Sequence, residues 1–220
     1  MNFKEQWKKI VKKGACELGI KLDASQLELM ALHGSELVKW NKKINITSIT
    51  DPFETAVRHF IDSVAMANHI PDNMRVLDIG SGGGFPGLPL KITNPTLDVV
   101  MADSLRKRIS FIKHVIRSAR LADVDALHTR CEDLAKTEGF THSFDIVVSR
   151  AFTSLDRFVS LAEPFLSENG VILAMKGKSG QNEIKSLCTK KNDINIHNYL
   201  LPFEKHERSI VIVKPGNHSD

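Results

Sequence analysis

The sequence predicts an α/β fold with a seven-stranded, mostly parallel sheet that follows a helical segment. Residues 1–70 carry helical patterns, whereas from residue 75 onward apolar strand patterns alternate with amphipathic helix patterns. The last two apolar runs are joined only by Pro202–Glu207, which is too short for a helical crossover. We therefore expect those two strands to pair antiparallel, so that one strand of the seven runs against the others.

The helical extension is expected to span residues 1–70, ahead of a sheet domain over residues 71–220. A capping box formed by Ser25 and Glu28 predicts the start of its main helix. Apolar residues then recur at helical spacing: Leu27, Met30, Leu37 and Trp40. We expect Trp40 either to pack in the core or to stack on a ligand. Asp51-Pro52 predicts a second helix, with the proline in the tolerated first turn.

Strands are predicted near residues 75–80, 97–103, 126–130, 144–149, 170–176, 194–201 and 208–214. Helices are predicted near residues 86–93, 105–120, 154–166 and 180–190. The buried stripe of the helix at 105–120 should consist of Leu105, Ile109, Ile112, Val115 and Ala119. Since apolar strands alternate with helices, the sheet should be covered on both faces. Ligands of such folds bind at the carboxyl ends of the strands.

The composition excludes several classes of protein. The three cysteines, Cys16, Cys131 and Cys188, lie far apart and form no C-x-x-C pair, so we expect neither disulfides nor a metal site. The sequence shows no export signal and no apolar run long enough for a membrane span, which favours the cytoplasm. Basic residues cluster within 4–13, 39–43 and 106–120. These clusters either form solvated helix faces or bind a phosphate backbone.

The run from Val76 to Gly87 joins an apolar strand to a glycine-rich turn and a proline that can open a helix. Glycines let bare backbone approach a ligand that faces the helix N-terminus. Asp78, just ahead of the glycines, would repel a phosphate but attract a cationic group. S-adenosylmethionine carries an ammonium and a sulfonium and no phosphate, so we expect this cofactor, with Gly80 and Gly82 in the turn. Asp103 ends the next strand pattern, where doubly wound folds place the carboxylate that binds a ribose.

Other glycine-loop sites fit the sequence less well. A dinucleotide fingerprint fits from Gly82 to Gly87 but leaves Asp78 unexplained. The hydrolase elbow needs a glycine where Ile79 stands, and the P-loop needs one where Ile172 stands. The remaining alternative is a plain tight turn between a strand and a helix.

The third predicted strand is followed by Cys131, Glu132 and Asp133. Glu132 or Asp133 is expected either to accept from an adenine amino group or to serve as an ordinary acid at a helix N-terminus. Cys131 is expected to be a packing residue, because only Arg130 beside it would lower its pKa.

The fourth predicted strand ends in Ser149-Arg150-Ala151-Phe152, which lacks the Asn/Asp-Pro-Pro-aromatic loop of enzymes that methylate exocyclic amines. Enzymes that methylate pyrimidine C5 need a cysteine nucleophile, which typically follows a proline. In this chain no cysteine follows a proline. A ring nitrogen such as guanine N7 needs neither device, only alignment with the methyl group. Arg150 should meet an acceptor: a methionine carboxylate, an RNA phosphate or guanine O6. The alternative is a structural salt bridge to a nearby acid such as Asp145.

Motifs along nearly the whole chain are those of one family: Trp40-Asn41-Lys42, Asn45-Ile46-Thr47-Ser48, Arg58-His59-Phe60-Ile61-Asp62-Ser63, Asp78 through Gly87, Asp103-Ser104, Lys107-Arg108, Arg130-Cys131-Glu132, Ser149-Arg150-Ala151-Phe152 and Lys176-Gly177. With them the chain resembles the glucose-inhibited division protein B family, the bacterial small-subunit ribosomal RNA guanine-N7 methyltransferases. That family more often has Ala-Glu or Val-Glu where this chain has Cys131-Glu132.

The resemblance implies a Rossmann-like methyltransferase sheet and transfer of a methyl group from S-adenosylmethionine to N7 of one guanine in 16S ribosomal RNA. It also implies that Gly80, Phe85, Asp103, Cys131-Glu132 and Arg150 line the cofactor site. The expected partner is 16S ribosomal RNA or the small ribosomal subunit, with no membrane, and we expect a monomer. Two alternatives stay open: a small-molecule methyltransferase, and an RNA-binding protein with a vestigial cofactor pocket.

Overall fold

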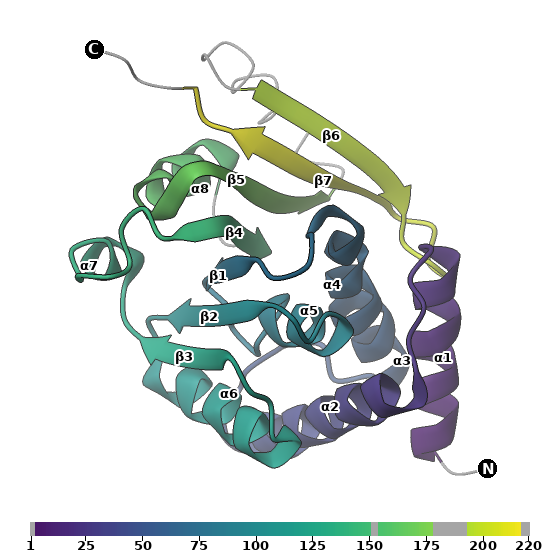
Figure 1. Ribbon diagram of the computed structural model, residues 1–220. Coiled ribbons are helices and arrows are strands. Elements are labelled where there is room, and N and C mark those ends of the chain that lie inside the picture. Colours follow the sequence, from purple (N-terminus) through teal and green to yellow (C-terminus); the bar gives the residue numbers. More distant parts are fainter. Residues whose placement is uncertain (1–2, 151–153, 178–192, 217–220) are drawn as a thin grey trace.

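The computed structural model describes residues 3–150, 154–177 and 193–216. A seven-stranded sheet crosses the molecule in the order β3-β2-β1-β4-β5-β7-β6 (Figure 1). Its strands are β1 Arg75–Ile79, β2 Asp98–Asp103, β3 Val124–His128, β4 Phe144–Arg150, β5 Leu166–Gly177, β6 Asp193–Leu200 and β7 Glu207–Lys214. Strand β7 is antiparallel to both of its neighbours, and every other pair in the sheet is parallel. The predicted sheet with one reversed strand is confirmed.

The described residues form the α-helices α1 Phe3–Glu17, α2 Ala24–Ile44, α3 Pro52–Thr55, α4 Asp62–Val64, α5 Gly87–Thr93, α6 Arg106–Ala119, α7 Cys131–Leu134 and α8 Leu155–Ala162. The helical extension ends in a continuous helical run from α3 onward, along which the helix type changes. A π-helix, η1 Ala56–Ile61, separates α3 from α4, and the 3-10 helices are η2 Ala65–His69 and η3 Glu163–Phe165. The predicted helix near 180–190 and Cys188 lie outside the described residues.

Alternate side chains of each central strand pack into two different cores, as strand geometry requires. Val76 of β1 packs in a core shared with α1, α2, α5 and α6, whereas Leu77 and Ile79 pack against α7 and α8. The extension therefore lies on the same face of the sheet as α5 and α6, and its buried residues belong to the same core. This packing brings α2 and the run from α3 to α4 next to the glycine turn.

Helix α2 begins at a different cap from the one that the sequence pattern predicts. Asp23 is extended and accepts a hydrogen bond from the Gln26 backbone N–H at 2.8 Å, while the Gln26 side chain accepts from the Asp23 N–H at 2.9 Å. The prediction of a Ser25–Glu28 box is wrong, because Ser25 already lies inside the first turn. Glu28 instead pairs with Lys4 of α1 at 2.6 Å and with Lys8.

Replacement of Asp23 by alanine is expected to lower the free energy of unfolding by about 1 kcal/mol, because the Gln26 backbone N–H in the first turn of α2 loses its capping acceptor. Ser25→Ala is the matched control and should leave stability nearly unchanged. Urea denaturation followed by circular dichroism measures both variants. Equal losses in the two variants would contradict the assignment of the cap to Asp23.

Four further boundaries differ from the sequence pattern. Leu105 is 42% exposed and extended, because it precedes α6 as its N-cap and does not belong to the buried stripe. Helix α8 ends at Ala162, since Pro164 cannot continue an α-helix, and β5 begins at Leu166. Strand β3 begins two residues earlier than predicted. Among the described helices, none has the length and apolar character that a membrane crossing requires.

Candidate functional site

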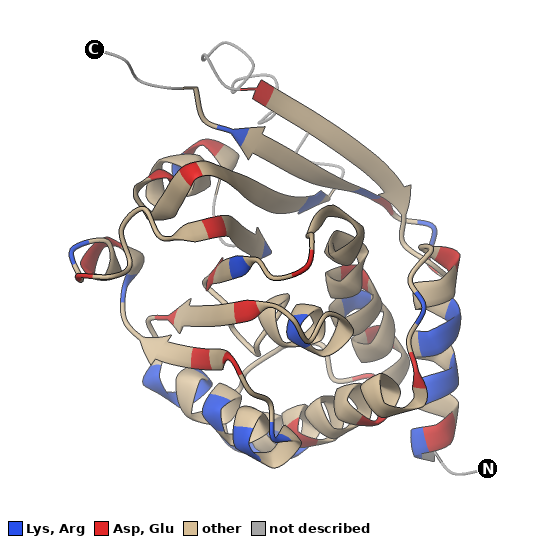
Figure 2. Ribbon diagram, in the orientation of Figure 1, with Lys and Arg blue, Asp and Glu red and all other residues tan. Residues whose placement is uncertain are grey.

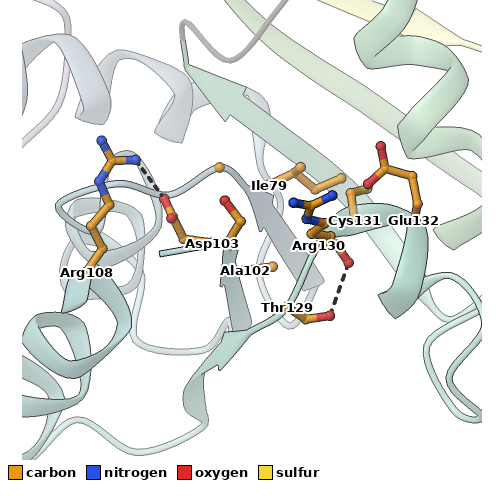
Figure 3. A pocket seen from close by; sticks show the side chains of 10 residues that line it. Ile79, Ala102, Asp103, Arg108, Thr129, Arg130, Cys131 and Glu132 are labelled. Carbon is orange, nitrogen blue, oxygen red and sulfur yellow. Dashed lines mark hydrogen bonds and ion pairs between the residues drawn. The ribbon is translucent and has the colours of Figure 1, made fainter. Parts of the chain in front are cut away.

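Two clefts open at the carboxyl edge of the sheet, on either side of the glycine turn. The first, of about 420 Å³, lies at the ends of β1, β2 and β3 and is lined by the predicted residues Gly80, Asp103, Cys131 and Glu132 (Figure 3). The second, of about 400 Å³, lies at the ends of β4 and β5 and is lined by Arg150. The structure thus places Arg150 in a different cleft from the four residues of the first.

Asp103 is held at the wall of the first cleft by three donors. Its Oδ1 accepts from the Leu105 N–H at 2.8 Å, and its Oδ2 accepts from the Gly82 N–H at 3.0 Å. The Arg108 guanidinium lies 3.2 Å from Oδ2 and points at the carboxylate from α6 (Figure 3). Gly82 does not line the cleft; it contributes a backbone donor that its φ of 57° aims at Asp103.

Asp78 lies beneath the glycine turn and is fully buried. Its Oδ2 accepts from the Gly87 N–H at 2.9 Å, while its Oδ1 has no hydrogen-bond partner among the described residues. Burial raises the pKa of this carboxyl to about 7. A Cβ at Gly87 would come within 2.7 Å of Met101 Cγ, so only glycine brings its N–H this close to the carboxylate. Asp78 lines neither cleft, and its Oδ1 is a buried acceptor without a partner among the described residues.

Phe85 lines neither cleft and is 4% exposed. Its ring is stacked between the rings of His33 and His59, with centroids 4.7 Å away on each side. Burial lowers the pKa of His33 to about 4 and that of His59 to about 3, so both imidazoles stay neutral at physiological pH. His33 also contacts the Gly83 carbonyl at 2.8 Å and so ties α2 to the glycine turn.

Arg150 is held by residues of the helical extension. Its Nη1 donates to the Arg58 carbonyl, its Nη2 donates to His59 Nδ1 at 2.9 Å, and its Nη1 lies 3.7 Å from Asp62 Oδ2. Asp145, the acid named as an example for a structural salt bridge, is not the partner, because it accepts from the Arg75 N–H at 2.8 Å at the opposite end of β4. A structural ion pair does exist, with Asp62 in place of Asp145.

Asp62 joins three parts of the chain beside the second cleft. Its Oδ1 accepts from the Tyr199 hydroxyl at 2.8 Å and lies 3.5 Å from Arg208 Nε. Burial raises the pKa of Asp62, and Arg150 and Arg208 act against that shift. The described lining of the second cleft holds one acid, Asp62, and four basic residues, Arg58, Arg150, Lys176 and Arg208. This lining favours an electron-rich ligand.

Cys131 and Glu132 begin α7 at the first cleft. Burial raises the pKa of the Cys131 thiol to about 12, which leaves it protonated and agrees with a packing role. The Glu132 carboxylate is exposed and lines the cleft, whereas Asp133 lies 3.9 Å from Lys136 and does not. Of the two candidate acids, Glu132 is the one placed to meet a ligand.

Lysines and arginines gather on the outer sides of α1 and α6 (Figure 2). Some of them are paired: Lys8 of α1 lies 2.6 Å from Glu5, and Lys113 of α6 lies 3.7 Å from Asp125. On α2, Lys39 lies 2.6 Å from Glu36. Within the described residues, no cluster of histidines, cysteines and acids has the grouping that a metal ion needs.

Comparison with known proteins gives concordant results. A family model described as rRNA small subunit methyltransferase G matches residues 26–211. Proteins named ribosomal RNA small subunit methyltransferase G are 43% identical in Geobacter sp. (strain M21), over 94% of this chain and 96% of that one, and 36% identical in Bacillus subtilis (strain 168), over 91% and 87%.

Solved structures with the same fold are more distant in sequence. A SAM-dependent methyltransferase from Aquifex aeolicus superposes with a TM-score of 0.58 at 15% identity and covers 77% of this chain and 96% of that one. A predicted O-methyltransferase from Agrobacterium tumefaciens gives a TM-score of 0.59 at 16% identity, with coverage of 71% and 82%. At these identities the likeness shows the fold alone.

Proposed function

The chain belongs to the rRNA small subunit methyltransferase G family, and on this premise we propose that it transfers a methyl group from S-adenosylmethionine to N7 of one guanine in 16S ribosomal RNA. The observation that carries the choice of a ring nitrogen is the second cleft. Its described lining offers several donors, while its neutral histidine, His59, uses Nδ1 to accept from Arg150. A ring nitrogen with a free lone pair can receive a methyl group without first losing a proton. A cleft lined by hydrogen-bond donors therefore suits a ring nitrogen as the methyl acceptor.

The first cleft has the groups that S-adenosylmethionine requires. Asp103 would accept from the two ribose hydroxyls, with Arg108 giving way or sharing the carboxylate, and Glu132 would accept from the adenine amino group. The unpartnered Asp78 Oδ1 would meet the methionine ammonium, directly or through water. When bound, the cofactor supplies a methyl group on a positively charged sulfur. A phosphate fits poorly, because Asp78 and Asp103 are both acids.

The second cleft would hold the guanine. The Arg150 guanidinium is repelled by a sulfonium, so it belongs on the acceptor side, where it would donate to guanine O6 and leave the N7 lone pair free. Arg58, His59 and Asp62 hold the guanidinium, so that the base is oriented by a fixed group. Positioning of this kind supplies roughly 7–11 kcal/mol of a barrier in favourable cases. We propose 16S ribosomal RNA or the assembling small subunit as substrate, a monomeric enzyme and a cytoplasmic location.

Mapping of N7-methylguanosine in 16S ribosomal RNA from cells with and without this protein tests the proposal. Borohydride reduction and aniline cleavage cut RNA at N7-methylguanosine. We expect a cleavage site that is present in cells with the protein and absent from cells without it. An unchanged cleavage pattern would contradict the proposal and would favour a small-molecule acceptor.

The affinity for S-adenosylmethionine is expected to rise with pH through about 7. The apo protein holds the Asp78 carboxyl with its pKa raised to about 7, so below that pH a proton must leave before the carboxylate can face an ammonium. By the same linkage, the protonated Asp78 carboxyl stabilises the apo fold. This contribution is fully present below the pKa of Asp78 in the unfolded chain and is lost as the pH rises through about 7.

Asp78→Asn keeps the acceptor for the Gly87 N–H but does not titrate. Calorimetric titrations between about pH 6 and pH 7.5, below the pKa of the cofactor's own amino group, should show weaker and pH-independent binding in this variant. Wild-type affinity that is flat or falls over that interval would contradict the role of Asp78.

A further inference from the structure

Two exposed phenylalanines, Phe53 of α3 and Phe203 of the β6–β7 connection, contact each other on the surface. Phe53 is 41% exposed and Phe203 is 36% exposed. Their ring centroids are 5.8 Å apart, with an interplanar angle of 68°. The two rings therefore meet edge to face, and each leaves part of its apolar surface open to a ligand.

This aromatic pair lies at the same edge of the sheet as the two clefts. Strand β6 is parallel to β5, since both are antiparallel to β7, so the connection after β6 lies at the carboxyl edge. Arg58 lines the second cleft and forms ion pairs with the residue that follows each phenylalanine. Its guanidinium lies 3.2 Å from Glu54, next to Phe53, and 2.8 Å from Glu204, next to Phe203. One side chain therefore connects the aromatic pair to the proposed guanine cleft.

The connection holds Phe203 outward at a conformational cost. Phe203 has φ of 70° and Lys205 has φ of 54°, in the left-handed region that bulky residues rarely adopt. The turn is fixed by fully buried Leu201, whose carbonyl accepts from the Lys205 N–H at 2.8 Å and whose N–H donates to the His206 carbonyl at 2.9 Å. Leu201 and Pro202 are buried, and the Phe203 ring is presented to solvent.

The charges around the aromatic pair favour an anionic partner. Lys13 of α1 lies 5.5 Å above the Phe203 ring, and α1 runs beside the β6–β7 connection (Figure 1). The nearby acids are engaged, Glu54 with Arg58 and Glu204 with Arg58 and His206. Lys13 and Lys205 form no ion pair with any residue in the described part of the chain. Exposed aromatic rings beside basic residues are the arrangement that binds single-stranded nucleic acid.

We propose that Phe53 and Phe203 form a stacking platform for an unpaired nucleotide of the RNA substrate, with Lys13 and Lys205 contacting the adjoining phosphates. The inference rests on the proposed function, since it takes RNA as the substrate. It adds a binding site outside both clefts, beside the one proposed for guanine. The platform would hold a nucleotide that flanks the methylated base in an unpaired loop.

Binding of a short fluorescent oligoadenylate at low salt tests the platform without reference to methylation. S-adenosylhomocysteine at saturating concentration keeps adenine out of the cofactor cleft. Phe203→Ala should weaken binding roughly 5- to 100-fold, the range that aromatic stacking of one base gives. Phe203→Tyr should bind within about twofold of wild type, and Phe203→Leu should behave like the alanine variant, because leucine keeps apolar packing but offers no aromatic face.

Leu200→Ala is the matched control, because Leu200 is 57% exposed and ends β6 near the same connection. It should bind as wild type does, and S-adenosylhomocysteine affinity should be equal in all variants. Wild-type affinity in Phe203→Ala or in Phe203→Leu would overturn the proposal. So would sedimentation showing that wild type is a dimer that Phe203→Ala dissociates. If the proposed function is wrong but the platform exists, the wild-type protein will transfer no methyl group to RNA. It will still bind the oligonucleotide, and Phe203→Ala will still weaken that binding.

Discussion

Asp103→Ala is expected to weaken S-adenosylmethionine binding on the order of 100-fold or more. Two ribose hydroxyls would lose a charged acceptor, and hydrogen bonds to charged groups are worth about 1.5–3 kcal/mol each. The Gly82 and Leu105 N–H groups would lose the same carboxylate, so the glycine turn would also lose one of its supports. Isothermal titration calorimetry with S-adenosylmethionine measures the change.

Asp98→Ala is the control for this experiment. Asp98 begins the strand that Asp103 ends, and it is exposed and 3.2 Å from Arg75. Its removal should leave cofactor affinity unchanged. Unchanged affinity in Asp103→Ala, in a protein that melts as a folded unit, would contradict the assignment of Asp103 to the ribose.

Arg150→Ala is expected to lower kcat for methyl transfer about 100-fold or more while changing cofactor affinity little, because the guanidinium lies in the second cleft, the one proposed to hold the guanine. We also expect a stability loss of about 1–3 kcal/mol, since the Arg58 carbonyl and His59 Nδ1 lose their donor. Asp62 keeps Tyr199 and Arg208, which limits that loss. Steady-state kinetics with 16S ribosomal RNA and thermal melting measure the two effects separately.

Arg150→Lys separates charge from geometry. Lysine keeps a cation beside Asp62 but lacks the planar fork that reaches Arg58 and His59 together. It should recover part of the stability and little of the kcat. Arg157→Ala, on the exposed side of α8, is the control and should behave as wild type. Full activity in Arg150→Ala would contradict the role in the acceptor cleft.

The sheet and the first cleft were predictable because their signals are local in the sequence. Strand and helix periods alternate clearly from β1 onward, and Asp103 directly ends an apolar run. The connection from Pro202 to Glu207 sufficed to predict the reversed strand, since chain length alone excludes a crossover. Asp78, which was singled out by its position ahead of the glycines, lies buried beneath the turn and lines neither cleft, and its role toward the cofactor stays a prediction.

The second cleft could not be assembled from the sequence because its contacts span distant segments. Asp62 and Tyr199 are 137 positions apart, and Arg150 and His59 are 91 apart. The sequence therefore suggested Asp145, the acid nearest to Arg150 along its own strand, as the partner. The motif Arg58 to Ser63 marked the right segment, but only tertiary packing shows that its side chains hold Arg150. The stacking of Phe85 between His33 and His59 could not be predicted for the same reason, because the three rings come from segments far apart in the sequence.

The most direct test of the central claim is methyl transfer by the purified protein to small-subunit RNA from cells that lack it. The RNA is incubated with S-adenosylmethionine labelled in its methyl group, digested to nucleosides and analysed by mass spectrometry. The account predicts label in N7-methylguanosine, about one per 16S RNA, and loss of that label with Asp103→Ala or Arg150→Ala. Label in another nucleoside, or no label in RNA from a protein that binds the cofactor, would contradict it.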